Sequence, residues 1–175
     1  MYIFKSQIIE NWMDCGTPKL IINSNSKMLT LLTPEPVGYK KEGSVEVIEP
    51  VFMGKNITIS NSTIGPGVTI NDNVEIKNSI IDSKSKLGHY CYIGDSVIGQ
   101  LVNIGAGTVT CNFDGDKKHK TNIKSKAFIG SGTMIIAPII INEGAKIGAG
   151  SVLTQDVQKY SLVYGVPAKK IRNLR

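Results

Sequence analysis

The sequence predicts an all-β fold, a parallel β-helix built from hexapeptide repeats. An aliphatic residue returns every six positions in the second half of the chain, without a slip from Ile123 to Leu153. Glycine often follows it, as in Ile64-Gly65 and Ile147-Gly148. A period of six fits neither the 3.6-residue turn of an α-helix nor the two-residue alternation of a plain strand. It indicates a solenoid in which three hexads form one triangular coil, with the aliphatic side chains stacked inward.

The repeat begins near Val51 and has three irregular steps. Seven residues separate Ile57 from Ile64, and five separate Ile76 from Ile81. A second five-residue step follows Ile93; we interpret all three steps as extra or missing residues at a corner. The sixteen positions predict about five coils. They are Val51, Ile57, Ile64, Ile70, Ile76, Ile81, Leu87, Ile93, Ile98, Ile104, Ile123, Ile129, Ile135, Ile141, Ile147 and Leu153.

One long interruption divides the repeat. The pattern stops at Thr110, and residues 111–122 (CNFDGDKKHKTN) contain no inward aliphatic side chain. We expect this segment to leave the wall of the β-helix as a loop. Long loops on a rigid scaffold are often functional, and a tolerated insertion is the alternative.

The repeat divides the chain into three parts. Residues 1–49 lack it and predict a short, partly helical N-terminal segment, with Ile8, Ile9 and Trp12 on one helical face and a helix over 19–32. Residues 50–157 form the predicted hexapeptide-repeat domain, with the ejected loop 111–122. Residues 158–175 form a basic C-terminal tail with a bend at Val166-Pro167.

Composition points to one domain in a reducing compartment. The chain has 175 residues and a net charge of +6, which fits a polyanionic ligand or solubility alone. Its three cysteines, Cys15, Cys91 and Cys111, are scattered and odd in number, which argues against a disulfide framework. The start resembles no signal peptide, and the longest apolar stretch, 134–141, is too short to cross a bilayer. We therefore expect a soluble, cytoplasmic protein with neither a membrane nor a nucleic-acid partner.

His89 is the first candidate for chemistry. It lies two positions after the inward Leu87, near a corner of the predicted coil. Histidine is the natural general base at neutral pH, although a lone histidine is more often structural. Polar residues at non-core positions of the same coils favour a site. They are Lys77, Tyr92, Asn103, Asn112 and Lys118.

Two further patterns leave alternatives open. Gly105-Ala106-Gly107 and Gly148-Ala149-Gly150 are followed by no helix, so they are not a dinucleotide fingerprint. Such small residues either let a ligand lie along the outer wall or only serve the corners. A zinc site is the rival use of histidine on this scaffold, as in γ-type carbonic anhydrases. The chain has only His89 and His119, too few for a three-histidine site, and we expect no metal.

Residues from about Asn71 to Val157 closely resemble a known family. The motifs GHxxYxGD, NIGAGTxTCNxDGxxKxKT and FxGS are similar to those in the acetyltransferase domain of the bacterial bifunctional enzymes that make UDP-N-acetylglucosamine, a cell-wall precursor. Those enzymes are glucosamine-1-phosphate N-acetyltransferases and N-acetylglucosamine-1-phosphate uridylyltransferases. The resemblance implies a left-handed β-helix, a homotrimer, and acetyl-CoA as co-substrate, bound between subunits.

The resemblance also implies roles for individual residues. His89 matches the general base, and Glu75 matches an acidic residue that orients it. The groups that hold the sugar phosphate are matched by Lys77, Tyr92, Asn103 and Lys118. The acetyl-CoA contacts are matched by Ala106, Asn112, Phe113, Ser131 and Ala149, with Lys169 in a tail similar to that of simpler hexapeptide acetyltransferases.

The chain departs from the family at three points. An ungapped alignment places Ile59 where the family has an arginine on the sugar phosphate, and Phe113 stands where it has tyrosine. The family's tail arginine that meets coenzyme A has no clear match. Residues 12–18 (WMDCGTP) resemble the end of a sugar-1-phosphate nucleotidyltransferase domain, whose nucleotide loop does not precede them here, so we expect no nucleotidyl transfer.

The expected function is acetyl transfer from acetyl-CoA to an amino-sugar phosphate, with glucosamine 1-phosphate the best match. In this mechanism His89 takes the amine proton and a backbone N–H near Ala106 stabilises the oxyanion. Cys91 and Cys111 are alternative nucleophiles. The alternative function is a catalytically weak or inactive trimerisation or regulatory module of a sugar nucleotidyltransferase system.

Overall fold

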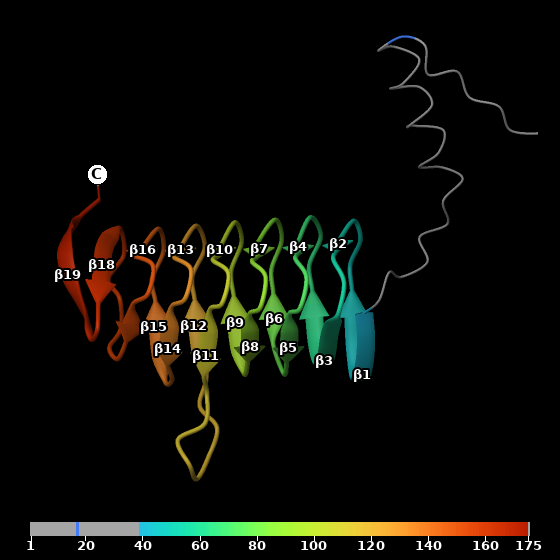
Figure 1. Cartoon of the computed structure of the whole chain (residues 1–175), viewed down its shortest axis with the longest axis horizontal. Coiled ribbons are helices and arrows are strands. Elements are labelled where there is room, and N and C mark those ends of the chain that lie inside the picture. Colours follow the sequence, from blue (N-terminus) through green and yellow to red (C-terminus); the bar gives the residue numbers. More distant parts are fainter. Residues whose placement is uncertain (1–16, 18–38, 175) are drawn as a thin grey trace, which may run out of the picture. The chain divides into compact units, whose positions relative to one another are not determined.

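The computed structural model describes Thr17 and residues 39–174, and these residues form strands and turns without a helix. The strands stack as coils one above another, from β1 at one end to β19 at the other (Figure 1). This confirms the all-β solenoid with hexapeptide repeats that the sequence predicts. The predicted helical segments at 8–12 and 19–32 lie outside the described residues. Within the described part, no helix has the length and hydropathy needed to span a membrane.

Three flat faces make up each coil, named here A, B and C. Strand β3 (Ile57–Ile64) pairs with β5 through Thr58 and with β6 through Thr63, so one sheet bends between these residues into faces A and B. Face A continues from β3 through β5 (Glu75–Lys77), β8 (Tyr92–Gly94), β11 (Val109–Cys111), β14 (Met134–Ile136) and β17 (Val152–Leu153). Face B continues through β6 (Ile80–Ile81), β9 (Ser96–Ile98), β12 (Thr121–Ile123) and β15 (Ile139–Ile141). Face C is a separate sheet of β2 (Phe52–Met53), β4 (Thr69–Ile70), β7 (Lys86–Leu87), β10 (Asn103–Ile104), β13 (Phe128–Ile129), β16 (Lys146–Ile147), β18 (Ser161–Gly165) and β19 (Ala168–Asn173).

One large aliphatic side chain per face and coil fills the interior. Because strands pair in parallel and in register, these side chains stack directly on one another, as Ile70 does on Leu87. Almost all are fully buried, and each such residue contributes about 1.5–3 kcal/mol of hydrophobic stabilisation. Face A deviates at Thr110, which is fully buried in register with Ile135, so the aliphatic pattern stops there although the coil continues.

A second inward column, two residues before the first, holds mostly small side chains. On face B its serine hydroxyls accept hydrogen bonds from the next coil, from Ser79 N to Ser62 Oγ at 3.0 Å and from Ser96 N to Ser79 Oγ at 3.0 Å. Ile57 belongs to the equivalent column of face A, together with Val74. On face C, Met53 pairs with Ile70, so the predicted assignment of Val51 to the main aliphatic column is wrong. The predicted assignment of Ile57 to that column on face A is wrong for the same reason.

Ile59 takes that main position instead. It is 0% exposed and pairs with Ile76. The step from Ile59 to Ile64 then has five residues, like the two five-residue steps that follow it. A phosphate-binding arginine would have no access to ligand at position 59, so the ungapped placement of the family's arginine there is also wrong.

The coil length changes at the loop. In the coils from β3 to β11, stacked partners are 17 residues apart, as in Lys86 with Asn103; in the coil that follows the loop they are 18 apart, as in Phe128 with Lys146. The short coils lack one residue at the corner between faces A and B. The loop leaves the wall at this same corner, between β11 and β12, and projects away from the stack (Figure 1).

The solenoid extends beyond the readable repeat at both ends. At the start, β1 (Tyr39–Val47) pairs in parallel with β3, ahead of Val51. At the other end, β18 continues face C and buries Val163. The chain then reverses at Val166-Pro167, and β19 pairs antiparallel with β18. Solenoid ends need such capping because an open coil would expose its interior.

Candidate functional site

His89 lies at the corner between faces C and A, and three predicted ligand-contact residues stack above it. In successive coils this corner is occupied by His89, Ala106 and then Ser131 and Ala149. Backbone hydrogen bonds fix the stack: Gly107 N donates to the His89 carbonyl at 2.8 Å, and Gly132 N donates to that of Ala106 at 2.7 Å. Gly150 N donates to the Ser131 carbonyl at 2.8 Å. We call this the histidine corner; it brings the predicted base and three of the predicted acetyl-CoA contacts onto one line.

The coils at this corner touch closely, which explains the glycine just before each stacked residue. A Cβ on Gly105 would lie 2.4 Å from Ser131 N, and one on Gly130 would lie 2.4 Å from Ala149 N. Such distances are far below van der Waals contact. The first glycine of each Gly-x-Gly is therefore required by packing.

The second glycine has a different explanation. Gly107, Gly132 and Gly150 have φ near +70°, but Asn56 and Asn73 hold the same left-handed corner in the lower coils. A Cβ on Gly107 or Gly132 would meet nothing closer than 3.9 Å, and one on Gly150 nothing within 4 Å. Neither conformation nor packing therefore demands glycine at these three positions. The result is a strip of outer wall without side chains that runs up the stack from His89, which we call the glycine strip.

Below the strip, the corner opens into a polar cleft of about 340 Å³. Glu75 and Tyr92, two of the predicted site residues, stand side by side on paired strands in its wall. The cleft is lined by Asn56, Thr58, Asn73, Val74, Glu75, Tyr90, Cys91 and Tyr92. Asn56, Asn73 and Tyr90 were not predicted as site residues, because the repeat places them on one corner but does not show that a cleft forms there.

Tyr90 is the least expected of the three. Its φ is +59°, a conformation that bulky residues seldom adopt, and its side chain is 69% exposed. It follows His89 directly and stands where the polar cleft ends and the glycine strip begins. Leu101 and Tyr160 share this left-handed conformation, so the exposure of the Tyr90 ring beside the cleft, and not its φ alone, makes it a candidate for a ligand contact.

The side chain of His89 is exposed and has no hydrogen bond or ion pair with any described residue, Glu75 included. Glu75 therefore makes no direct contact in the described chain through which it could orient His89, the role that the resemblance implies for it. The amide of Ala106 is also uncommitted within the described chain, which leaves one N–H donor directly above His89.

The remaining predicted residues lie elsewhere. Lys77 is half-buried on face A and pairs with Gly94, toward the corner where the loop leaves. Asn103 lies on face C, between Lys86 and Phe128 in the stack. The predicted contacts Asn112, Phe113 and Lys118 belong to the loop.

The loop is internally ordered, with a bridge between Phe113 and Lys118. Asp114 accepts hydrogen bonds from Lys117 N at 2.8 Å and Asp116 N at 2.9 Å, and its carboxylate pairs with His119 Nε2 at 2.6 Å. The backbone N–H of Lys117, then the His119 ring and the N–H of Asp116, hold the pKa of Asp114 well below its usual range. Phe113 is 59% exposed and Lys118 is exposed, so neither rests on the wall of its own coil.

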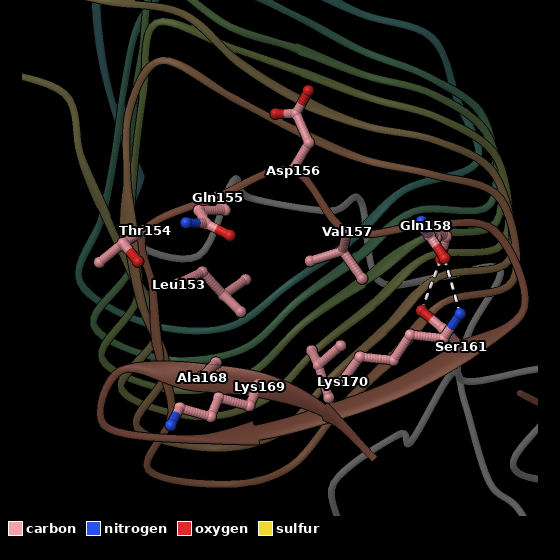
Figure 2. A pocket seen from close by; sticks show the side chains of 11 residues that line it. Leu153, Thr154, Gln155, Asp156, Val157, Gln158, Ser161, Ala168, Lys169 and Lys170 are labelled. Atoms are coloured by element: carbon pink, nitrogen blue, oxygen red, sulfur yellow. Dashed lines mark hydrogen bonds between the residues drawn. The ribbon is translucent and has the colours of Figure 1, made fainter. Parts of the chain in front are cut away.

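Lys169 lies at the C-terminal end of the stack. It lines a cavity of about 300 Å³ between the last coil and β19, together with Ala168 and Lys170 (Figure 2). Lys170 Nζ donates to Gln158 Oε1 at 2.6 Å across this cavity. Lys169 does not line the polar cleft, which lies in the lower coils of the stack.

Cys91 and Cys111, the alternative nucleophiles, are both free cysteines. Burial raises the pKa of Cys91 and that of Cys111, which keeps both thiols protonated and weakly nucleophilic near neutral pH. No three His, Cys, Asp or Glu side chains of the described residues gather as metal ligands.

Comparisons with known proteins agree with this fold. The bacterial transferase hexapeptide family (six repeats) matches residues 120–155. The chain is 45% identical over 91% of its length to the bifunctional protein GlmU of Desulfitobacterium hafniense, and 42% identical over 82% to that of Carboxydothermus hydrogenoformans. It spans 44% and 34% of those relatives. The chain therefore matches less than half of each protein.

Solved structures support the fold independently. A mutant of AntD, an N-acyltransferase from Bacillus cereus in complex with dTDP and coenzyme A, superposes with a TM-score of 0.67 at 21% identity, covering 86% of this chain and 89% of that one. The polySia-specific acetyltransferase NeuO gives a TM-score of 0.57 at 18% identity, with coverages of 78% and 85%. At these identities the likeness concerns the fold.

Proposed function

We propose that this chain, a hexapeptide-repeat relative of the bifunctional GlmU proteins, is an acetyl-CoA-dependent N-acetyltransferase for an amino-sugar phosphate, with glucosamine 1-phosphate as the first candidate. One observation carries the proposal. His89 stands at the junction of the glycine strip and the polar cleft. An acyl donor on the strip and an acceptor in the cleft would meet at this imidazole.

The glycine strip suits the elongated donor. Ala106, Ser131 and Ala149 leave the wall flat, so a pantetheine arm can lie along it with its thioester next to His89. The acetyl carbonyl then meets the free N–H of Ala106, which serves as oxyanion donor. The protein named in one similar structure, AntD, binds coenzyme A on the same fold.

The polar cleft suits the acceptor. Its amine attacks the thioester carbonyl while His89 takes the amine proton. The tetrahedral intermediate then collapses, forms the amide and releases coenzyme A as its thiol. Holding both substrates on one rigid wall supplies part of the rate by proximity. In this proposal Tyr92 binds the sugar phosphate in the cleft, Lys77 reaches it from farther along face A, and Glu75 orients His89 through the bound substrate.

The split of the predicted residues between two corners supports a homotrimer. Asn112, Phe113 and Lys118 leave the wall at the opposite edge of face A from His89, and Lys169 lies at the end of the stack. The family resemblance implies a homotrimer with acetyl-CoA bound between subunits, and we propose that the loop of one copy meets the histidine corner of another in this trimer. The complete acetyl-CoA site would then need two chains.

A thiol-release assay tests the proposal. The purified chain is incubated with acetyl-CoA and a panel of amino-sugar phosphates, with glucosamine 6-phosphate and unphosphorylated glucosamine as matched controls. We expect release with glucosamine 1-phosphate well above the controls. Specific binding of acetyl-CoA with no turnover on any acceptor would contradict the proposal and support a regulatory module.

A further inference from the structure

The side chain of Asp95 joins the ejected loop to the wall. Asp95 occupies the corner between faces A and B, directly after β8. One carboxylate oxygen accepts a hydrogen bond from Asn112 Nδ2, at the first residue of the loop after β11. The other accepts one from Asn78 Nδ2 in the coil below, at 3.2 Å.

The backbone of Asp95 holds the other end of the loop. Its carbonyl accepts a hydrogen bond from Thr121 N at 3.2 Å, where the chain returns to the wall. In the coils below, the N–H groups at the position of Thr121, those of Ser79 and Ser96, donate to a serine hydroxyl of the preceding coil. Thr121 N donates to the Asp95 carbonyl instead, so this series of hydrogen bonds ends there. The Thr121 hydroxyl is buried with no hydrogen-bond partner among the described residues. One residue therefore fixes both ends of the loop at the point where the regular ladder is lost.

The fold alone does not require an aspartate at this corner. Asn61 and Asn78 occupy it in the two lower coils, with φ of +46° and +49°, and Asp95 has φ of +47°. An asparagine thus satisfies the backbone here. The carboxylate adds a second acceptor oxygen, and that oxygen is the one that meets Asn112.

We infer that Asp95 is a positioning residue for the loop that carries Asn112, Phe113 and Lys118. It acts through Asn112, whose side chain is almost fully buried at the neck of the loop. Asn112 also links this anchor to the rest of the loop, because its carbonyl accepts a hydrogen bond from His119 N at 2.8 Å. The effect of Asp95 on catalysis rests on the proposed function; its effect on loop order does not.

Three variants separate the roles of Asp95. Asp95→Ala removes both acceptors. Asp95→Asn keeps one acceptor and supplies an N–H that a rotated Asn112 amide can accept, so it removes the charge and keeps the contact. Asn61→Ala is the matched control, because it places alanine at the same corner with nearly the same φ and the same backbone strain.

Loop order is measured first, by the rate of trypsin cleavage at the exposed Lys117 and Lys118 in the full chain. Loss of both side-chain hydrogen bonds of Asp95, to Asn78 and to Asn112, predicts about tenfold or faster cleavage in Asp95→Ala. Asp95→Asn and Asn61→Ala should stay within about threefold of the original chain. Wild-type cleavage in Asp95→Ala, or equally fast cleavage in Asn61→Ala, would overturn the inference.

Turnover is measured on the same proteins. We expect kcat/KM for the acceptor to fall about tenfold in Asp95→Ala and to recover in Asp95→Asn. If Asp95→Asn is as inactive as Asp95→Ala while its loop resists trypsin, the charge acts on the reaction itself and the positioning role is wrong. If the original chain shows no acetyl transfer, the proposed function fails, and the cleavage rates still decide whether Asp95 holds the loop.

Discussion

The lower and upper coils of the histidine corner share one backbone and differ in what they present to solvent. Asn56, Asn73 and Tyr90 hold the left-handed position in the lower coils, and Gly107 and its two successors hold it in the upper coils. Since asparagine suffices for the conformation, the bare upper wall is not a consequence of folding. The difference teaches that the inward residues fix the frame of the solenoid, and that the outward residues of one corner can change without changing its backbone conformation.

His89 marks the boundary between the two regions, and its removal should have the largest effect. A general base contributes about 10²–10⁴ in rate, so His89→Ala should lower kcat by that factor. Acetyl-CoA affinity, measured by calorimetry, should stay within about twofold because the glycine strip is untouched. A parallel loss of affinity and turnover would mean that His89 binds the donor and is not a base.

The two glycines of one Gly-x-Gly should respond in opposite ways. Gly130→Ala forces a methyl group against Ala149 N and should destabilise the fold by about 1–3 kcal/mol, measured by denaturant unfolding. Gly132→Asn reproduces the residue found at Asn56 and Asn73, and its stability should change by less than about 1 kcal/mol. Equal destabilisation by both changes would refute the distinction between a packing glycine and a free one.

Gly132→Asn also tests donor binding, because it places the asparagine of the lower coils on the glycine strip of the upper coils. Its side chain would stand on the glycine strip, so acetyl-CoA should bind about tenfold or more weakly while the fold is kept. The matched control is Asn73→Gly, which exchanges the same two residue types below Tyr90, outside the glycine strip, and should leave acetyl-CoA affinity unchanged. Donor affinity that falls in the control and not in Gly132→Asn would place the donor in the polar cleft.

Tyr90→Asn removes the aromatic boundary and restores the residue type of the coils below. Loss of one aromatic contact predicts an increase of about three- to tenfold in KM for the acceptor. KM for acetyl-CoA should hold, and the melting temperature should not fall, because asparagine tolerates this φ better than tyrosine. Tyr90→Phe, which keeps the ring, should behave like the original chain, and an equal effect of both variants would contradict a stacking role.

The smallest expected effect is the pH dependence of the loop. Because the folded-state pKa of Asp114 is lowered, its contribution to loop order is present above the ordinary aspartate pKa of about 3.9 and is lost as pH falls through the lowered value. Hydrogen exchange at Lys117 N and Asp116 N should therefore remain protected at pH of about 4. Asp114→Asn is the control that no longer titrates, and protection lost already at pH of about 5 would contradict the lowered pKa.

The sequence predicts the β-helix well because inward residues repeat. The sequence does not predict which residue belongs to the main inward column where both inward columns hold similar side chains. Ile57 and Ile59 are both aliphatic, and only strand register shows which one stacks on Ile76. Thr110 escapes notice because a threonine can fill a core position without being apolar.

The candidate site is predictable only in part. Stacking follows from the repeat, so His89 and Ala106 can be placed on one corner once the coil is known. The polar cleft depends on which residues take a positive φ, and Tyr90 gives no such signal. The anchor at Asp95 joins residues 17 positions apart through side chains, which no local pattern reveals.

The central claim is that donor and acceptor occupy the upper and lower regions of one corner. Amide chemical shifts of the ¹⁵N-labelled chain, followed by NMR during separate titrations with acetyl-CoA and glucosamine 1-phosphate, test it most directly. We predict that acetyl-CoA shifts the amides of Gly107, Gly132 and Gly150, and that the sugar phosphate shifts those of Glu75 and Tyr92. Both ligands perturbing the same amides, or neither perturbing this corner, would contradict the account.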